Sequence, residues 1–261
     1  MNHIALDQYI DLNSVIHRLD ARTKFLFTLL FIFVVVSSPA GSWLAFIIYF
    51  TVISILVLVS KLPIGHVLKR SLLIVPFVIL IAIFVPFFRE GEIVCSFQLW
   101  KMRVNVTYEG ILVLETIIIK AWLSVLSLVW LTSVTRVTSL LRALRRLHLP
   151  GVLVMIISFM YRYLFVIVDE TLRMKQARDC RDFGGKKLRQ LQSIGSIIGT
   201  LFIRSYERSE RVYYAMVSRG FDGEIRTQDS LALQKADIIF GACLYCLIIS
   251  IAICNIWVLR W

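Results

Sequence analysis

Charged side chains are scarce in this 261-residue chain: Asp, Glu, Lys and Arg make up 18% of it, against about 25% in an ordinary soluble domain. Hydrophobic residue types reach 58%. A single soluble core has too little interior to hide so much apolar surface, which excludes a soluble globular domain. The same composition excludes a disordered chain, because disordered segments are poor in aromatic and β-branched residues. The composition therefore indicates a protein of the lipid bilayer.

Motifs for nucleotide hydrolysis, redox chemistry and metal binding are missing. No GxxxxGK[ST] loop occurs, so we expect this chain not to hydrolyse ATP on its own. The four histidines are scattered without an HxxxH pair, whereas metal sites need several convergent ligands. The five cysteines are an odd number, and Cys243 and Cys246 lie in an uncharged stretch where thiols act as small apolar groups. We therefore expect no catalytic residue, no metal ligand and no cofactor.

Positive charge is in excess and is concentrated in one block. The chain has 29 Lys and Arg against 17 Asp and Glu, a net charge of +12. The block from Arg136 to Lys235 holds 18 basic and 9 acidic residues, and such segments are biased to the cytoplasmic side of a membrane. Its arginines are interleaved with apolar residues at helical spacing beside predicted spans. This arrangement favours anionic lipid headgroups or an acidic protein as partner, and no nucleic acid is expected.

Five uncharged runs approach the roughly 20 apolar residues that a helix needs to cross a bilayer. Basic residues dominate alternate connections between them, which predicts an N-terminus inside and a C-terminus outside. The predicted fold is an all-α polytopic membrane protein with about five transmembrane helices and a cytoplasmic domain of amphipathic helices. We expect four spans in residues 1–135, the cytoplasmic domain in 136–235 and a final transmembrane helix in 236–261. The runs are Phe25–Ser38, Trp43–Ser60, Ser71–Phe88, Ile111–Ser133 and Ile238–Leu259.

Two stretches depart from this pattern. Lys120 lies inside the fourth run, where a charge is costly, and we favour a contact within the helix bundle over a substrate path. Gly151–Val168 is apolar enough for a sixth crossing, but it contains Arg162 and continues into a charged segment. We interpret it as the apolar half of one long helix from about Pro150 to about Arg178, packed under the membrane domain or lying in the interface. Whether this half is interfacial, buried or spanning stays open.

A second cytoplasmic helix follows the first. Apolar residues recur at steps of three and four between Leu188 and Tyr206, the period of one helix face, and Gly220 supplies a C-terminal stop. The two helices thus end near Arg178 and Arg219. A guanidinium on a rigid helix end suits a carboxylate-lined groove, because its fork makes paired, charge-assisted hydrogen bonds. The plainer alternative is a solvated arginine that complements the helix dipole.

Short motifs accompany these features. A His-x-x-Asp-x-Arg-x-Lys stretch runs from His17 to Lys24, and a Phe-Met-Tyr-Arg-Tyr segment occupies Phe159–Tyr163. The second segment is followed by Asp169, Glu170, Arg173 and Met174. Two Ala-Arg-Gly-type motifs stand at the predicted helix ends, as Ala177-Arg178-Asp179 and Ser218-Arg219-Gly220, each with one departure. With these motifs the whole chain resembles the CbiQ family, the T components of energy-coupling factor (ECF) transporters for cobalt, within the wider EcfT-like family.

The resemblance implies a non-catalytic subunit that neither binds the transported substrate nor cleaves ATP. A T component joins a substrate-binding membrane S component, CbiM-like with a possible small CbiN-like accessory subunit, to a pair of CbiO-like ABC-type ATPases. Its two arginine-bearing helix ends seat in grooves of the ATPases and transmit their motion. It is a multi-pass protein of the bacterial inner membrane, among lipids, with its N-terminus and coupling domain cytoplasmic. The implied coupling residues are Ala177, Arg178, Asp179, Ser218, Arg219 and Gly220, with Arg181 as an auxiliary candidate.

The sequence leaves three alternatives to a cobalt importer subunit. The same role in a nickel or vitamin transporter fits equally, since the substrate site would reside in another polypeptide. A polytopic membrane enzyme acting on lipid substrates would need a convergent acid, base or metal cluster, and the sequence has no such set. A membrane anchor would use its basic helices only to hold anionic lipid, and then no arginine would matter more than another.

Overall fold

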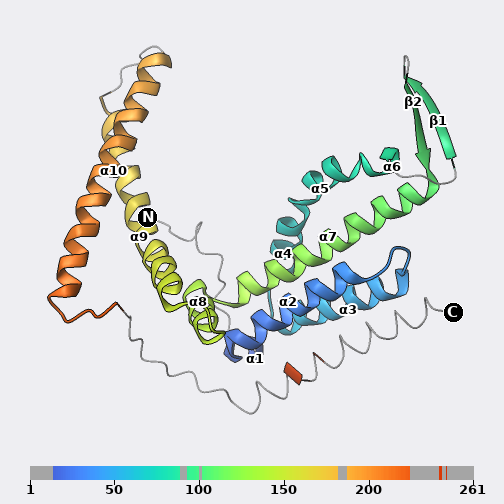
Figure 1. Ribbon diagram of the computed structural model, residues 1–261, viewed down its shortest axis with the longest axis horizontal. Helices are drawn as coiled ribbons and strands as arrows, with labels where there is room; N and C mark the ends of the chain where they lie inside the picture. The colour runs from blue at the N-terminus through green and yellow to red at the C-terminus, as the bar shows by residue number, and fades with distance from the viewer. Residues whose placement is uncertain are drawn as a thin grey trace. The chain divides into compact units, whose positions relative to one another are not determined.

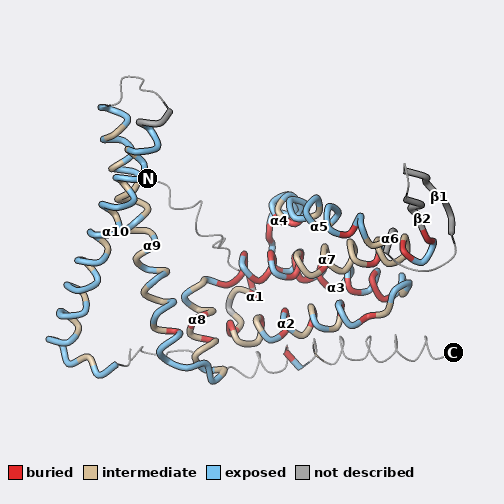
Figure 2. The backbone as a smooth tube through the Cα atoms, turned by 45° about the horizontal axis from the view of Figure 1, so that its top comes forward, coloured by how far each residue is buried: buried red, intermediate tan, exposed pale blue. Residues whose placement is uncertain are grey.

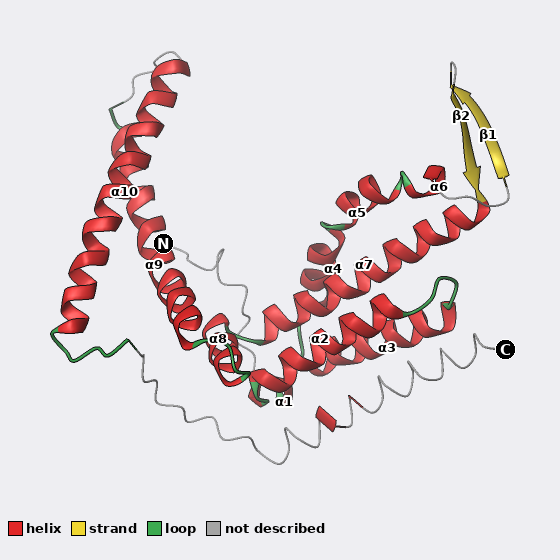
Figure 3. Cartoon of the chain, viewed as in Figure 1, coloured by secondary structure: helices red, strands yellow, loops and turns green. Residues whose placement is uncertain are grey.

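Helices make up most of the chain in the computed structural model (Figure 3). The structure describes residues 14–88, 93–99, 102–181 and 187–223, together with Gly241, Ala242 and Tyr245. These residues belong to two compact units that divide between Leu140 and Leu141. The fifth predicted span, Ile238–Leu259, lies almost wholly outside the described residues.

The first unit begins with a short helix and a helical hairpin (Figure 1). Helices α1, α2 and α3 cover Val15–Arg18, Ala21–Ser37 and Trp43–Val59. Asp20 caps α2 by accepting a hydrogen bond from the backbone N–H of Arg22 at 3.0 Å. Gly41 makes the turn before α3 with a φ of +88°, which residues with a Cβ rarely adopt. The first two predicted runs are therefore helices joined by a tight turn, as expected.

The third predicted run is divided into pieces. Helices α4, α5 and α6 cover Ile64–Leu72, Val75–Ala82 and Val85–Phe88. Pro76 and Pro86 stand in the first turns of α5 and α6, where the missing N–H interrupts no helical hydrogen bond. The expected helix over Ser71–Phe88 is thus interrupted, because each proline favours a new helix start, although its first part belongs to a stretch, Ile64–Ala82, that is long and apolar enough to cross a membrane. Lys69 and Arg70, which precede the predicted run, lie in the last turn of α4.

A two-stranded hairpin that the sequence analysis did not predict follows α6. Strand β1, Ile93–Leu99, pairs antiparallel with β2, Met102–Thr107, and Leu99 stands opposite Met102. The signal was present in the sequence, because apolar and polar residues alternate along β2 and along most of β1. The all-α expectation therefore needs this one addition among the described residues.

The long helix α7, Tyr108–Val134, is the element against which the other helices of this unit pack. It contacts α2, α3, α4, α5 and α6, and its buried residues face these neighbours (Figure 2). Trp130 is 1% exposed, and its ring packs edge-on against Phe27 at a centroid distance of 6.0 Å. Its indole N–H donates to Ser60 Oγ at 2.9 Å. One side chain of α7 thus holds both helices of the first hairpin by apolar and polar contacts.

The lysine inside the fourth predicted run makes a structural contact. Lys120 Nζ donates hydrogen bonds to the backbone carbonyl of Val36 at 2.9 Å and to that of Ser38, both at the C-terminal end of α2. Carbonyls at the end of a helix lack partners within the helix, and a cation there also complements the helix dipole. The predicted contact within the bundle is therefore confirmed.

Two long helices dominate the second unit. Helices α9 and α10 cover Gly151–Asp179 and Lys187–Val217, and α8, Val137–Arg146, runs across the division between the units. Pro150 stands directly before α9, a position that suits a residue with a fixed φ and no N–H. Both long helices predicted from the sequence are therefore confirmed.

Three helical stretches in the described part of the chain could cross a membrane, by length and apolar composition alone. They are Ile64–Ala82, Tyr108–Val134 and Gly151–Asp179. Helix α3 is apolar but shorter. The predicted class, a predominantly α-helical membrane protein, is confirmed. The number of five spans stays a prediction, since α9 is itself long and apolar enough to cross.

Candidate functional site

Helices α9 and α10 lie side by side and run in opposite directions (Figure 1). Glu170 of α9 joins them: one carboxylate oxygen accepts a hydrogen bond from Arg204 at 2.8 Å, and the other accepts one from Arg208 at 3.0 Å. The Glu170 side chain is 16% exposed, so these charge-assisted bonds are partly shielded from water. Arg204 and Arg208 stand one turn apart on α10, so a single carboxylate of α9 bridges two successive turns of the facing helix.

The antiparallel arrangement separates the two predicted arginine motifs. Ala177 and Ile197 line the same groove near the end of α9, and Arg219 follows Ile197 by 22 residues. At a rise of 1.5 Å per residue, this is roughly 33 Å along the helix. Arg178 and Arg219 therefore stand near opposite ends of the α9–α10 hairpin, as two separate contact points.

At the end of α9, Arg178 is paired with its own neighbour. Its Nε and Nη2 atoms both donate to Asp179 Oδ1, at 3.0 and 2.7 Å. The side chain of Arg178 is 24% exposed and that of Asp179 is 52% exposed. Helix α9 ends at Asp179, and the next residue, Cys180, carries an exposed free thiol. The first motif is thus a helix end whose guanidinium is already engaged.

A polar groove of about 460 Å³ runs between the two helices beside this end. Arg178 and Arg181 line it from the α9 side. The hydroxyl-bearing residues Ser193, Ser196 and Thr200 line it from α10. Guanidinium and hydroxyl groups both donate hydrogen bonds, so the groove, named here the tip groove, suits a carboxylate or another anion.

The end of α10 is closed by a Schellman motif. The N–H of Phe221 donates to the carbonyl of Met216 at 3.1 Å, and that of Gly220 donates to the carbonyl of Val217 at 3.0 Å. Gly220 has a φ of +79°, which explains why the cap needs glycine. Arg219 precedes this glycine and is exposed, and none of the ion pairs found in the described ranges involves it. The predicted helix stop is confirmed, and it presents an exposed guanidinium on a fixed backbone.

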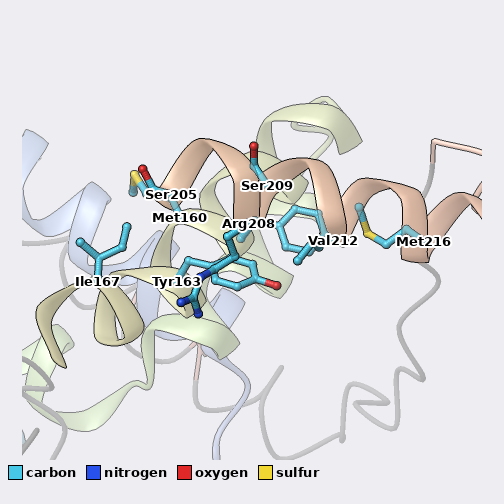
Figure 4. A pocket seen from close by; sticks show the side chains of 9 residues that line it. Met160, Tyr163, Ile167, Ser205, Arg208, Ser209, Val212 and Met216 are labelled. Carbon is cyan, nitrogen blue, oxygen red and sulfur yellow. The ribbon is translucent and has the colours of Figure 1, made fainter. Parts of the chain in front are cut away.

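A second groove lies between the middle of α9 and the C-terminal half of α10. It measures about 260 Å³ and its lining is mainly apolar, with Met160 and Met216 from the two helices. Figure 4 shows the Tyr163 ring and the Arg208 side chain within it, and Arg208 is also bonded to Glu170. The α9–α10 hairpin therefore has an apolar groove on one side of the Glu170 contact and the polar tip groove on the other.

The N-terminal motif serves the packing of the first unit. Asp20 and Lys24 are 5% and 4% exposed, and Lys24 Nζ donates to the backbone carbonyl of His17 at 3.2 Å. This bond ties α1 to the first turn of α2. Across the residues with described positions, no three His, Cys, Asp or Glu side chains gather where they could hold a metal ion.

The seven residues predicted to act in coupling fall into two groups. One group is Ala177, Arg178, Asp179 and Arg181 at the tip groove, and the other is Ser218, Arg219 and Gly220 at the cap of α10. Sequence reasoning missed the contact that holds the two helices together. It used Glu170 only as part of a family resemblance, although Arg204 and Arg208 at one-turn spacing were a readable signal for an acidic partner.

Comparison with known proteins places this architecture in a family. The model of the family CbiQ, described as cobalt transport protein, matches residues 12–230. The energy-coupling factor transporter transmembrane protein EcfT of Acidaminococcus fermentans is 30% identical over 100% of this chain and 98% of its own length, and that of Lactococcus lactis subsp. cremoris is 27% identical with the same coverage. A protein of Methanocorpusculum labreanum named as a fused cobalt transport protein, CbiMQ, is 26% identical over 85% of this chain and 38% of its own length. Since the family model spans most of its residues, the chain belongs to the CbiQ family of cobalt transport proteins.

Proposed function

We propose that this chain is the T component of an ATP-driven ECF-type importer for cobalt. The family description supports cobalt as cargo, and the two EcfT relatives support the role of a transmembrane coupling subunit. In this proposal the chain is not an enzyme. It joins a pair of CbiO-like ABC-type ATPases to a CbiM-like S component with a small CbiN-like accessory subunit. Uptake of radioactive cobalt by the complete complex, with nickel as competitor, tests the cargo.

The observation that carries this proposal is the α9–α10 hairpin. Its helices have 29 and 31 residues, Glu170 holds them together, and each ends on an arginine motif. We propose that each end docks into a carboxylate-lined groove of one ATPase subunit. The residues proposed for this contact are Ala177, Arg178, Asp179 and Arg181 at one end and Ser218, Arg219 and Gly220 at the other.

The proposed mechanism depends on the stiffness of the hairpin. When ATP binding closes the ATPase pair, the two docked ends are displaced together with the subunits that hold them. The hairpin then moves as a lever, because Glu170 keeps its helices in register. Its apolar groove and the exposed apolar residues of α9 move with it, and we propose that they pass the displacement on to the S component.

We propose the bacterial inner membrane as the location, with the N-terminus and the α9–α10 hairpin on the cytoplasmic side. The basic block that contains both helices supports this orientation, since Lys and Arg near membrane spans are retained inside. It also puts both arginine motifs in the compartment that supplies ATP.

Charge reversal at both motifs tests the docking. The variant with Arg178→Glu and Arg219→Glu should lose its ATPase subunits after gentle detergent extraction and still insert into the membrane, because its apolar segments are unchanged. Arg211→Glu is the matched control: Arg211 is an exposed arginine of α10 away from the helix end, paired with Glu207 at 3.7 Å. This control should keep its ATPases.

Two outcomes would contradict the proposal. ATPases retained by the double variant would show that these arginines do not dock. An equal loss from Arg211→Glu would mean that any basic residue of the helices serves, as the lipid-anchor alternative requires.

A further inference from the structure

Asp179 occupies the edge of the Arg178 guanidinium that a partner carboxylate would use. A guanidinium binds a carboxylate most strongly through two parallel N–H groups on one edge. In Arg178 the edge formed by Nε and Nη2 already faces Asp179 Oδ1, at 3.0 and 2.7 Å. The Arg178 side chain is also largely covered, being 24% exposed. A partner carboxylate must therefore displace Asp179 before it can pair with this edge.

Among the residues that the structure describes, none competes in this way for Arg181. Its backbone N–H donates to the carbonyl of Arg178 at 2.8 Å, which continues the last turn of α9 and brings its side chain into the lining of the tip groove. Arg181 is exposed, and it takes part in none of the ion pairs that the described segments contain. Arg178 can offer a new partner only its Nη1–Nη2 edge, on which Nη2 already donates to Asp179, whereas no described ion pair engages the guanidinium of Arg181.

We infer that Arg181 presents the docking guanidinium at the α9 end, while Asp179 holds Arg178 as a positioning group in the wall of the tip groove. The inference rests on the proposed docking function and names the group that performs it. The partner is an acidic surface of an ATPase subunit. A carboxylate that pairs with Arg181 in this groove also meets the hydroxyls of Ser193 and Ser196 on the facing helix, while the hydroxyl of Thr200 donates to the carbonyl of Ser196 at 2.9 Å.

The end of α10 differs in this respect. Gly220 follows Arg219 and has no side chain that could compete for its guanidinium. Arg219 can therefore dock directly. The two ends of the hairpin therefore differ in whether the arginine of the motif is already paired. The cause is Asp179, which stands where the family pattern has glycine.

Alanine substitutions separate the two arginines at the α9 end. The measurement is the affinity of the full chain for its ATPase subunits, by titration in detergent at fixed salt. We expect Arg181→Ala to weaken binding by about tenfold, the range of a charge-assisted hydrogen bond. Arg178→Ala should weaken it about threefold or less. In an Asp179→Gly background Arg178 is released, so Arg178→Ala should become the more harmful of the two.

Thr171→Ala is the control, because Thr171 lies on α9 and lines neither groove of the hairpin. The hydroxyl of Thr171 donates to the carbonyl of Ile167 at 2.7 Å and touches neither arginine motif, so affinity should not change. The inference is overturned if Arg178→Ala is the more harmful substitution in the unaltered chain, or if Asp179→Gly leaves their order unchanged. Arg219→Glu tests the proposed function itself. If both Arg219→Glu and Arg181→Ala bind the ATPase subunits normally, docking through arginines is wrong and the inference falls with it.

Discussion

Gly220 is the residue on which the position of Arg219 depends most directly. Its φ of +79° strains any residue with a Cβ by about 1 kcal/mol, although a Cβ there would meet no atom within 4 Å. Gly220→Ala therefore introduces backbone strain without a clash. We expect the cap of α10 to fray, seen as faster hydrogen exchange of the Phe221 amide, and ATPase binding to weaken about fivefold.

Gly199→Ala provides the comparison for this prediction. Gly199 lies within α10 and its Cβ position is also open. Alanine favours a helix interior over glycine by about 1 kcal/mol, so this variant should be as stable as the parent or more so, with unchanged binding. Normal ATPase binding by Gly220→Ala would show that docking does not need the Schellman cap.

At the scale of single residues, local backbone chemistry could be predicted and side-chain partners could not. Pro150 marks the start of α9 and Gly220 the end of α10, as expected, because the constraints of proline and glycine act within one turn. The engagement of Arg178 by Asp179 depends on which rotamers the two side chains adopt, and the sequence pattern does not specify them. The predicted motif was correctly placed at the helix end, but the pairing of Arg178 with Asp179 was not predicted.

The contact between α9 and α10 depends on one acidic side chain that faces two basic ones. Glu170→Gln removes the negative charge and leaves Arg204 and Arg208 near each other without it. Because both arginines are partly exposed, we discount the pairs for solvent screening and expect a loss of about 1 kcal/mol. Hydrogen exchange of the facing turns of α9 and α10 should accelerate about fivefold, and the amount of cobalt imported per ATP hydrolysed should fall.

Glu207→Gln controls for the loss of an acidic side chain from the same helix pair. Glu207 is 56% exposed and pairs with Arg211 inside α10 at 3.7 Å, so it does not connect the two helices. This variant should leave exchange and transport unchanged. If Glu170→Gln also leaves exchange and transport unchanged, the carboxylate does not hold α9 and α10 together, and other contacts must do so.

At the scale of elements, helices were predictable from long apolar runs and from caps, and interruptions were harder to predict. An apolar run looks the same whether it is one helix or several, so the division into α4, α5 and α6 was visible only in the positions of Pro76 and Pro86. The β1–β2 hairpin was missed because two strands of seven and six residues carry a weak alternation signal beside strong helical ones.

At the scale of the whole molecule, the apolar composition predicted the class and the short motifs indicated the family, whereas the long-range contacts could not be predicted. Trp130 and Ser60 are 70 residues apart in the chain, and Glu170 and Arg204 are 34 apart. The sequence around each of these residues does not predict which residue it contacts. Such contacts are set by how helices pack, which depends on the shapes of entire surfaces rather than on a periodic pattern.

The orientation of the chain in the membrane can be measured through Cys180, the exposed thiol at the end of α9. In a variant whose other cysteines, Cys95, Cys243, Cys246 and Cys254, are replaced by alanine, a membrane-impermeant maleimide should label Cys180 in inverted membrane vesicles and not in intact cells. The reason is the retention of the basic block inside. Cys180→Ala in the same background should remove the signal.

A second reporter then fixes the number of crossings. Trp261→Cys, in a chain that also carries Cys180→Ala, should be labelled from outside intact cells if five spans separate it from a cytoplasmic N-terminus, as the sequence predicts. Labelling of Cys180 itself from outside would mean that the apolar half of α9 crosses the bilayer, as its length and composition allow. In that case Arg178 and Arg181 could not reach a cytoplasmic ATPase, so this single labelling result bears on the fold and on the coupling mechanism together.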